Sequence, residues 1–183
     1  MIRITSGAYR GMKVFTGNAL KAQPVISVIR EAVFNILRSY ISCTGLHVCD
    51  LFCGSGSMSF EALSRGAAHA CMVDSYAPNL ELVKKTASNL GVKGLLNTIC
   101  CDIRDLPWAE RRYDLAFVDP PYAEPELAEI SLRGLVEHGW CSEGSYVVLR
   151  IKKGGKVNIP SKYELLDRRA YCASEVLFMS VQA

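Results

Sequence analysis

The sequence predicts an α/β protein with a Rossmann-like, mostly parallel sheet that is covered on both faces. Short apolar runs alternate with amphipathic segments from residue 46 onward, which is the pattern of strands buried between helices. Glycine marks several of the changes from one kind of segment to the next. Four of the apolar runs end in or near an aspartate. In open α/β sheets ligands bind beyond the carboxyl ends of the strands, so we expect one polar rim around one pocket.

The first half of this region contains three strands and two helices. The strand expected at 46–52 leads into the glycine turn "CGSGS" and a helix over 58–66, which Gly66 closes. A second strand covers 69–74, and a third covers 95–102. The helix between them, over 79–91, ends at Gly91 and has one apolar face at helical spacing. That face comprises Leu80, Val83, Ala87 and Leu90.

The second half ends in a hairpin. Strands are expected at 113–119 and 144–151, with a helix over 124–139 between them. The tail holds two further strand-like runs, over 162–171 and 175–182, with no helix between them. Parallel neighbours need a long crossover, whereas antiparallel strands can be joined by a tight turn. The last strand is therefore predicted to be antiparallel.

The charge is unevenly distributed along the chain. Residues 1–45 hold six Lys or Arg and one acid, whereas residues 46–183 hold fifteen Lys or Arg and seventeen acids. We expect a basic N-terminal extension over 1–45 and a main domain over 46–183. A basic arm on a near-neutral body is typical of a protein that binds a polyanion. An ordinary solvated basic surface is the alternative, and charge alone does not separate the two.

The composition indicates a cytoplasmic protein without a resident metal. No apolar run approaches the ~20 residues that cross a bilayer, and the start "MIRITSGAYRG" lacks the apolar core of a signal peptide. The eight cysteines form no C-x-x-C pair, and no histidine has a zinc-like spacing. We therefore expect buried, reduced thiols that pack as small apolar side chains. We also expect a monomer that does not associate with membranes.

The glycine loop indicates an adenosine-containing cofactor, with a plain tight turn as the alternative. Gly54 and Gly56 lie between a strand and a helix, where glycine lets the backbone approach a ligand closely. Asp74 ends the next strand, where a carboxylate can accept hydrogen bonds from ribose hydroxyls. Asp102 ends the strand after that, where an adenine amino group can be recognised. Asp50 would repel a pyrophosphate and suits a cationic ammonium, which favours S-adenosylmethionine over a dinucleotide. The expected cofactor-binding residues are Asp50, Phe52, Cys53, Gly54, Gly56, Asp74, Ser75, Asp102 and Ile103.

The segment "FVDPPY" (117–122) predicts a site for an acceptor amine. Proline cannot donate to a strand ladder, so the strand ends here. An exocyclic amine on a base is a poor nucleophile, because its lone pair is delocalised into the ring. The Asp119 carboxylate and the Pro120 carbonyl can accept its N–H bonds and direct the lone pair at a methyl group, while Tyr122 stacks on the base. The expected catalytic residues are Asp119, Pro120, Pro121 and Tyr122; a purely structural turn is the alternative.

These motifs carry a family resemblance. "DLFCGSGSMSFEALSRGA" together with "FVDPPY" resembles the class I methyltransferases that modify exocyclic amines of nucleic acids. The segments "RITSGAYRGMKV" (3–14) and "VIREAVFNIL" (28–37) resemble the opening of the bacterial RsmD family, the 16S rRNA guanine-N2 methyltransferases. The similarity runs from Arg3 to about Arg150. It implies a seven-stranded sheet, S-adenosylmethionine as donor, and a guanine N2 amine of 16S rRNA as acceptor. The rRNA would be met within the small ribosomal subunit or an assembly intermediate.

The resemblance also assigns the N-terminal extension to RNA binding. It implies that the hairpin with Arg3, Arg10 and Lys13 grips RNA, and that the helix with Arg30, Glu31 and Asn35 closes over the pocket. Arg30 is included among the RNA-binding residues. The sequence departs from the family pattern at Gln23-Pro24-Val25-Ile26, where an arginine and polar side chains are usual. We expect a phosphate contact to be lost there.

Three other functions were weighed against this one. An amino methyltransferase acting on adenine in DNA, on another RNA or on a protein side chain shares the pocket chemistry, and the N-terminal extension argues against it. A catalytically inactive RNA-binding module would keep the basic extension while its pocket decayed, yet the full set of pocket residues is present. An NAD-dependent oxidoreductase is disfavoured by Ser59 in place of the third fingerprint glycine and by the double proline.

Overall fold

The structure contains a seven-stranded sheet of the predicted kind. The computed structural model describes residues 2–17 and 23–183, with the side chains of the first helix described from Ser27 onward. The strand order is β5-β4-β3-β6-β7-β9-β8. The first five strands in this order are parallel, and β9 runs antiparallel to both of its neighbours. The strands are β3 His47–Leu51, β4 His69–Asp74, β5 Leu96–Cys100, β6 Leu115–Val118, β7 Tyr146–Lys152, β8 Tyr163–Tyr171 and β9 Ser174–Val181. The predicted fold class is therefore confirmed, the antiparallel C-terminal strand included.

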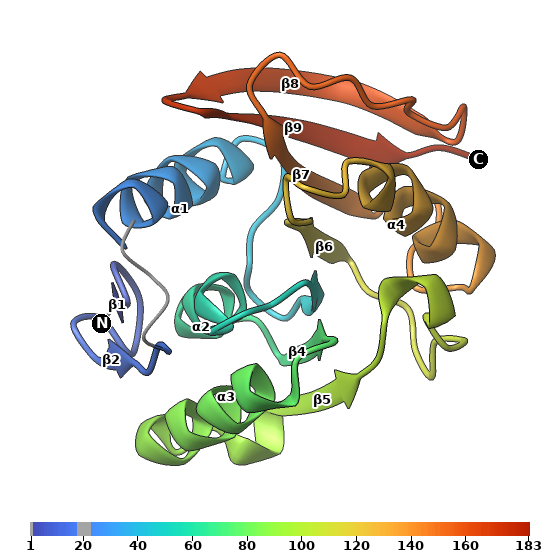
Figure 1. Ribbon diagram of the computed structural model, residues 1–183. Helices are drawn as coiled ribbons and strands as arrows, with labels where there is room; N and C mark the ends of the chain where they lie inside the picture. The colour runs from blue at the N-terminus through green and yellow to red at the C-terminus, as the bar shows by residue number, and fades with distance from the viewer. Residues whose placement is uncertain (1, 18–22) are drawn as a thin grey trace.

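Helices cover both faces of this sheet (Figure 1). Helices α1 (Gln23–Leu37), α2 (Ser57–Ser64) and α3 (Ala77–Leu90) lie on one face, and α4 (Glu126–Glu137) lies on the other. Short 3-10 turns, η1 (Lys93–Leu95) and η2 (Ile103–Asp105), border β5. Helix α3 begins earlier than its apolar spacing indicates, because Pro78 fits its first turn, where a missing N–H costs nothing.

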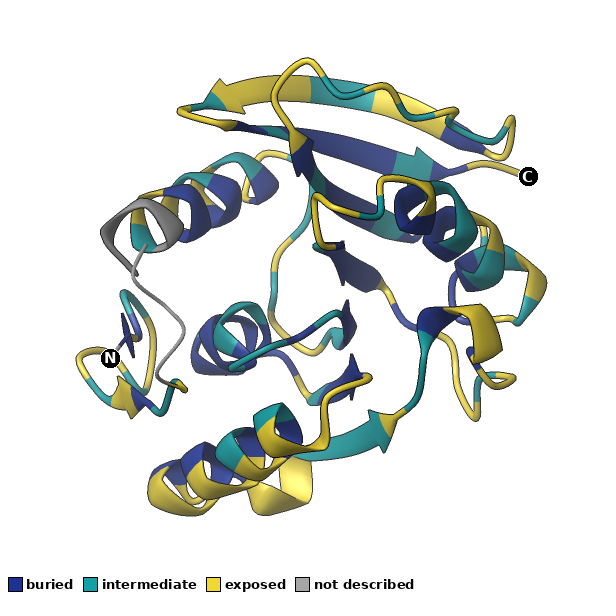
Figure 2. Cartoon of the chain, in the orientation of Figure 1, coloured by how far each residue is buried: buried dark blue, intermediate teal, exposed yellow. Residues whose placement is uncertain are grey.

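Two apolar cores fill the space between the sheet and its helices. The core under α1–α3 contains Phe34, Phe60 and Phe117, and the core under α4 contains Leu132 and Trp140. Figure 2 shows the central strands as mostly buried, while β8 at the edge is largely exposed or intermediate. The N-terminal segment contributes Ile2, Ile4 and Val14 to the core under α1–α3. The domain boundary expected after residue 45 stays a prediction.

The N-terminal segment forms a small hairpin that is held against the end of α2. Strands β1 (Ile2–Arg3) and β2 (Lys13–Val14) pair antiparallel. Between them, Gly7 has a φ of +85°, and a Cβ there would lie 1.8 Å from the carbonyl oxygen of Ser64. Only glycine fits this contact. It lets Ala8 N donate to that same carbonyl oxygen over 2.8 Å.

The cysteines are free thiols in several environments. Cys49, Cys53, Cys71 and Cys141 are buried, whereas Cys100 and Cys172 are exposed, so the expectation of burial holds for only part of the set. Burial raises the pKa of Cys71 to about 11, which keeps this thiol protonated. Within residues 2–17 and 23–183, no helix has the length and apolar character needed to cross a membrane.

Candidate active site

Two cavities lie at the carboxyl ends of the parallel strands, on either side of Phe52. The first cavity is open between α1 and the ends of β3, β6 and β7. It is lined by Ile29, Arg30, Val33, Asp50, Phe52, Cys53, Ser57, Met58, Phe117, Val118, Asp119, Val148, Arg150 and Val176. The second lies toward β4, β5 and α4. It is lined by Phe52, Val73, Asp74, Ser75, Cys101, Asp102, Ile103, Arg104, Pro121, Glu124 and Leu127. Together the cavities bring the polar residues from four strand ends to one edge of the sheet.

The glycine loop borders the two cavities through Phe52, which lines both, and Cys53, which lines the first, whereas Gly54 and Gly56 line neither. Phe52, Gly54 and Gly56 all have positive φ angles, at 63°, 54° and 72°. A Cβ on Gly56 would lie 2.8 Å from the sulfur of Met72. The N–H of Gly54 donates to Asp74 Oδ2 over 2.8 Å. The loop is therefore fixed in a left-handed backbone conformation, with Gly56 packed against core side chains.

Asp50 is a buried acid on the wall of the first cavity. Its residue is 3% exposed, and Ser59 Oγ donates to its Oδ2 over 3.0 Å. Burial raises the pKa of Asp50 to about 7; the Ser59 hydrogen bond opposes this, and the charge of Asp119 adds to it. A buried carboxyl with a strongly raised pKa in a cavity is a candidate binding group for a cation.

Asp74 and Asp102 both reach the second cavity, and both already have partners. Asp74 accepts from Gly54 N, from Tyr76 N over 2.9 Å and from Asn79 Nδ2 over 3.2 Å. Asp102 accepts from Arg104 N over 2.9 Å and forms an ion pair with the Arg104 guanidinium. Asp74 therefore supports the glycine loop besides facing the cavity, a second role that its position at a strand end does not indicate.

Asp119 is paired with an arginine that the sequence analysis did not single out. Arg150 Nε donates to Asp119 Oδ1 over 2.6 Å, and Arg150 Nη2 donates to Oδ2 over 2.7 Å. The side chain of Asp119 is 38% exposed and that of Arg150 is 25% exposed, since both border the first cavity. Burial raises the pKa of Asp119, and the charge and hydrogen bonds of Arg150 act in the opposite direction.

Of the rest of the "DPPY" turn, Pro121 lines the second cavity, whereas Pro120 and Tyr122 line neither of the two and border a separate cavity with Pro121. Pro120 is buried, Pro121 is exposed, and Tyr122 is 40% exposed. The hydroxyl of Tyr122 shares a 2.7 Å hydrogen bond with Ser174 Oγ. The guanidinium carbon of Arg150 lies 5.7 Å from the centre of the Tyr122 ring. Tyr122 thus offers an aromatic ring that is held at its edge and open to solvent.

The expected RNA-binding residues fall into two groups. Arg3, Arg10 and Lys13 are exposed on the hairpin, with Arg3 Nη1 donating to Gly11 O over 2.7 Å. Arg30 is only 1% exposed, so it offers no surface to an RNA phosphate in this structure. Its Nη2 donates to Arg3 O over 2.7 Å, and its Nε lies 3.3 Å from Glu61 Oε2. The side chains at 23–26 lie outside the described residues.

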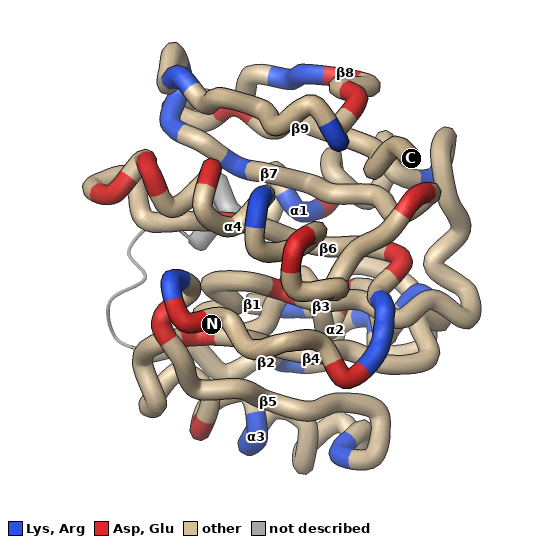
Figure 3. The backbone as a smooth tube through the Cα atoms, turned by 90° about the vertical axis from the view of Figure 1, so that its right-hand side faces the viewer, with Lys and Arg blue, Asp and Glu red and all other residues tan. Residues whose placement is uncertain are grey.

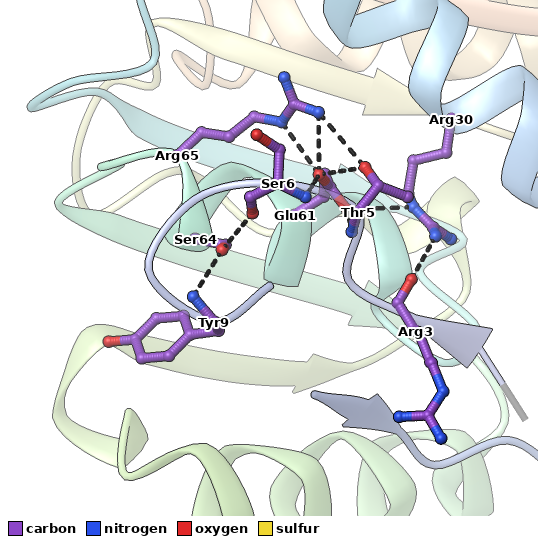
Figure 4. Close-up of polar contacts among 8 residues, drawn as sticks. All are labelled: Arg3, Thr5, Ser6, Tyr9, Arg30, Glu61, Ser64 and Arg65. Carbon is purple, nitrogen blue, oxygen red and sulfur yellow. Dashed lines mark hydrogen bonds and ion pairs between the residues drawn. The ribbon is translucent and has the colours of Figure 1, made fainter. Parts of the chain in front are cut away.

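Glu61, which no sequence motif indicated, anchors this network (Figure 4). The side chain of Glu61 is fully buried. It accepts from Thr5 N over 2.9 Å, Thr5 Oγ1 over 2.6 Å and Ser6 N over 3.1 Å. It also pairs with Arg65 over 2.9 Å and with Arg30. The sequence did contain a signal for the buried role of Glu61, because this acid lies between the apolar Phe60 and Ala62 on the buried side of a helix.

Three further features bear on which ligands the site can bind: the distribution of charged residues, the potential metal ligands and an unpaired nitrogen of Arg30. On the side of the molecule that Figure 3 shows, basic and acidic residues are interspersed over the sheet and helices. Among the described residues, no group of three or more His, Cys, Asp and Glu side chains is placed to hold a metal ion. Arg30 Nη1 is buried and has no hydrogen-bond partner among these residues, although Arg30 lines the first cavity. This orphaned donor suits an anionic group of a ligand.

Comparisons with known proteins place this chain in a family. Residues 2–180 match the family model described as "Conserved hypothetical protein 95". The "Ribosomal RNA small subunit methyltransferase D" of Haemophilus influenzae is 28% identical over 92% of this chain and 88% of the relative. The "Uncharacterized methylase RP545" of Rickettsia prowazekii is 23% identical over 98% and 97%. The solved "Putative methyltransferase yhhF" from Escherichia coli shares the fold, with a TM-score of 0.86 at 23% identity over 100% and 98% of the two chains. The chain belongs to the Conserved hypothetical protein 95 family, the RsmD-type methyltransferases.

Proposed function

We propose that this protein transfers a methyl group from S-adenosylmethionine to the exocyclic N2 amine of a guanine in 16S rRNA. The observation that carries the proposal is the meeting of two sets of residues at one edge of the sheet. Asp50 and Cys53 line the first cavity together with Asp119, Asp74 lines the second together with Pro121, and Phe52 lines both. The name of the Haemophilus influenzae relative supports small-subunit rRNA as the acceptor.

The cavities fit the parts of S-adenosylmethionine. Asp50 would bind the ammonium of its methionine part, and the orphaned Nη1 of Arg30 would bind the carboxylate in the same cavity. Asp74 with Ser75 would hold the ribose, and Asp102 with Ile103 would border the adenine in the second cavity. Phe52, Cys53, Gly54 and Gly56 would form the wall between the two parts. When bound, the cofactor supplies an electrophilic methyl group on a sulfonium.

The "DPPY" turn would position the acceptor. Asp119 and the Pro120 carbonyl accept the two N–H bonds of the amine, which orients the nitrogen lone pair toward the methyl carbon. With the cofactor bound, the lone pair would form the new N–C bond, the sulfur would keep the electrons of the broken C–S bond, and the nitrogen would release a proton to solvent. Tyr122 stacks on the base, a contact worth about 1–3 kcal/mol. Orientation supplies most of the rate enhancement.

The N-terminal extension would hold the RNA. Arg3, Arg10 and Lys13 are exposed on the hairpin, where they can contact phosphates. Helix α1 lines the first cavity through Ile29, Arg30 and Val33, so the extension borders both the RNA surface and the pocket. We also propose that the chain divides by function into residues 1–45, which contact RNA, and residues 46–183, which form the methyltransferase domain.

A methyl-transfer assay tests the proposal. The purified protein receives S-adenosylmethionine with a radiolabelled methyl group, together with small ribosomal subunits, free 16S rRNA, duplex DNA or protein. Label in the rRNA as N2-methylguanine supports the proposal; label only in DNA, in protein or on adenine contradicts it. Asp119→Ala should abolish most turnover and leave cofactor affinity in calorimetry nearly unchanged. Failure of the wild-type protein to bind the cofactor would instead indicate an inactive binding module.

A further inference from the structure

We propose that Arg150 is a positioning residue that holds Asp119 ionised and in one orientation toward the acceptor amine. The inference rests on the function proposed above. It adds to the reaction a residue that neither the sequence motifs nor the comparisons assign.

The geometry of the pair matches this role. The planar guanidinium meets both carboxylate oxygens, with Nε–Oδ1 at 2.6 Å and Nη2–Oδ2 at 2.7 Å. A two-pronged pair fixes the plane of the carboxylate as well as its position, which the point charge of a lysine does not do. An ionised carboxylate has about four acceptor positions, and Arg150 uses two of them. Two remain for the N–H bonds of an amine while the pair stays intact.

The sheet brings the two residues together. In the parallel pair β6 and β7, Val118 lies opposite Leu149, so the next residues of both strands are neighbours at the carboxyl edge. Side chains alternate along a strand, which places Asp119 and Arg150 on the same face as Phe117 and Val148. All four line the first cavity. The pair is therefore a consequence of backbone register.

Asp119 needs this partner because its surroundings disfavour its negative charge. Among the described residues, the charged or titratable groups that line the cavity with Asp119 are Asp50 from β3, Arg30 from α1, Cys53 from the glycine loop and Arg150, and the Tyr122 ring lies beside Arg150. Arg30 is already paired with Glu61. Without Arg150, burial would raise the pKa of Asp119 unopposed, because Arg150 supplies the charge and the hydrogen bonds that act against it. A protonated Asp119 would lose acceptor capacity, and the amine would lose part of its hold.

Arg150 also connects the two groups that would hold the base. Its guanidinium carbon lies 5.7 Å from the centre of the Tyr122 ring, while its nitrogens hold Asp119. Ser174 secures the hydroxyl end of the same ring over 2.7 Å. The expected orientation of the ring relative to the carboxylate thus depends on Arg150, which contacts both groups, together with Ser174 at the hydroxyl end of the ring.

Kinetics of three variants test the proposal. Arg150→Met removes the ion pair with Asp119, and Arg150→Lys keeps a positive charge but cannot donate to both carboxylate oxygens in one plane. Arg168→Met is the matched control, since it removes the Arg168–Glu175 ion pair outside the two cavities. At neutral pH, R150M should lower kcat about a hundredfold with little change in KM for S-adenosylmethionine. The deficit should narrow as the pH rises, because alkali re-ionises Asp119. R150K should recover part of kcat, and R168M should match the wild type. A deficit that is constant across the pH range would overturn the proposal.

Thermal unfolding supplies a readout that does not need activity. The melting temperature of R150M should fall further below that of the wild type as the pH rises, because the ionised Asp119 then lacks its partner. Adding Asp119→Asn to R150M should close this gap. A gap that does not change with pH, or that persists in the double variant, would overturn the electrostatic role. If the wild-type protein methylates no RNA, the proposed function fails, and this measurement still decides whether Arg150 keeps Asp119 ionised.

Discussion

Replacing Asp50 by asparagine is expected to stabilise the ligand-free protein at alkaline pH and to weaken cofactor binding. The carboxyl of Asp50 is buried on the cavity wall, and Ser59 Oγ donates to it over 3.0 Å. An amide has nearly the same shape, carries no charge and can still accept that bond. The variant therefore removes a buried charge while it keeps the packing.

The expected gain follows from the pKa of Asp50, which is about 7 in the folded protein against an ordinary 3.8. Between these pH values the folded protein holds a proton that the unfolded chain has released, so stability falls as the pH rises through this interval. At about 1.36 kcal/mol per pH unit the loss is about 4 kcal/mol, and it is complete above the folded-state pKa. Below the ordinary pKa the loss is absent.

Urea unfolding at acid and alkaline pH measures this effect. The stability advantage of D50N over the wild type should be near zero at about pH 4 and should approach about 4 kcal/mol at about pH 8. Asp105→Asn is the control, because Asp105 is exposed. Calorimetry on the same variant should show weaker binding of S-adenosylmethionine, whose ammonium would lose its partner. An advantage for D50N that is the same at both pH values would refute the reasoning.

Three further predictions concern the N-terminal hairpin and the cofactor site. Glu61→Gln should lower the free energy of unfolding by roughly 3–5 kcal/mol, the usual cost of breaking a buried ion pair, and a loss in urea unfolding below ~1 kcal/mol would contradict the anchoring role. Asp74→Ala should weaken S-adenosylmethionine binding in calorimetry by ~1–3 kcal/mol, because charge-assisted bonds are lost; an unchanged Kd would remove Asp74 from the site. Neutralising Arg3, Arg10 and Lys13 together should flatten the dependence of log K for RNA on log salt. The same change at the exposed Lys84, Lys93 and Lys162 serves as the control. If the slope of the hairpin variant equals that of the wild type, the hairpin is not the RNA-binding surface.

The sequence predicted the sheet and the positions of its acids because both depend on local pattern. Apolar runs that end in an acid located Asp50, Asp74, Asp102 and Asp119, and the structure brings all four to the carboxyl edge. The alternation of segments likewise indicated the parallel strands, and the missing helix in the tail indicated the antiparallel β9.

The partners of these residues could not be predicted in the same way. Arg150 lies 31 residues from Asp119, and the pair depends on β6 and β7 being adjacent in the sheet. Arg30 was expected to meet RNA, but it is buried against Glu61, which lies on a different helix. Such contacts follow from strand order and helix packing, which the charge and spacing of a single segment do not specify.

The shortness of α2 has a geometric consequence. Its eight residues begin directly after Gly56 and end at Ser64, which receives the backbone of the hairpin. The glycine loop and the basic hairpin are therefore attached to opposite ends of one two-turn helix, and the length of that helix sets the spacing between them.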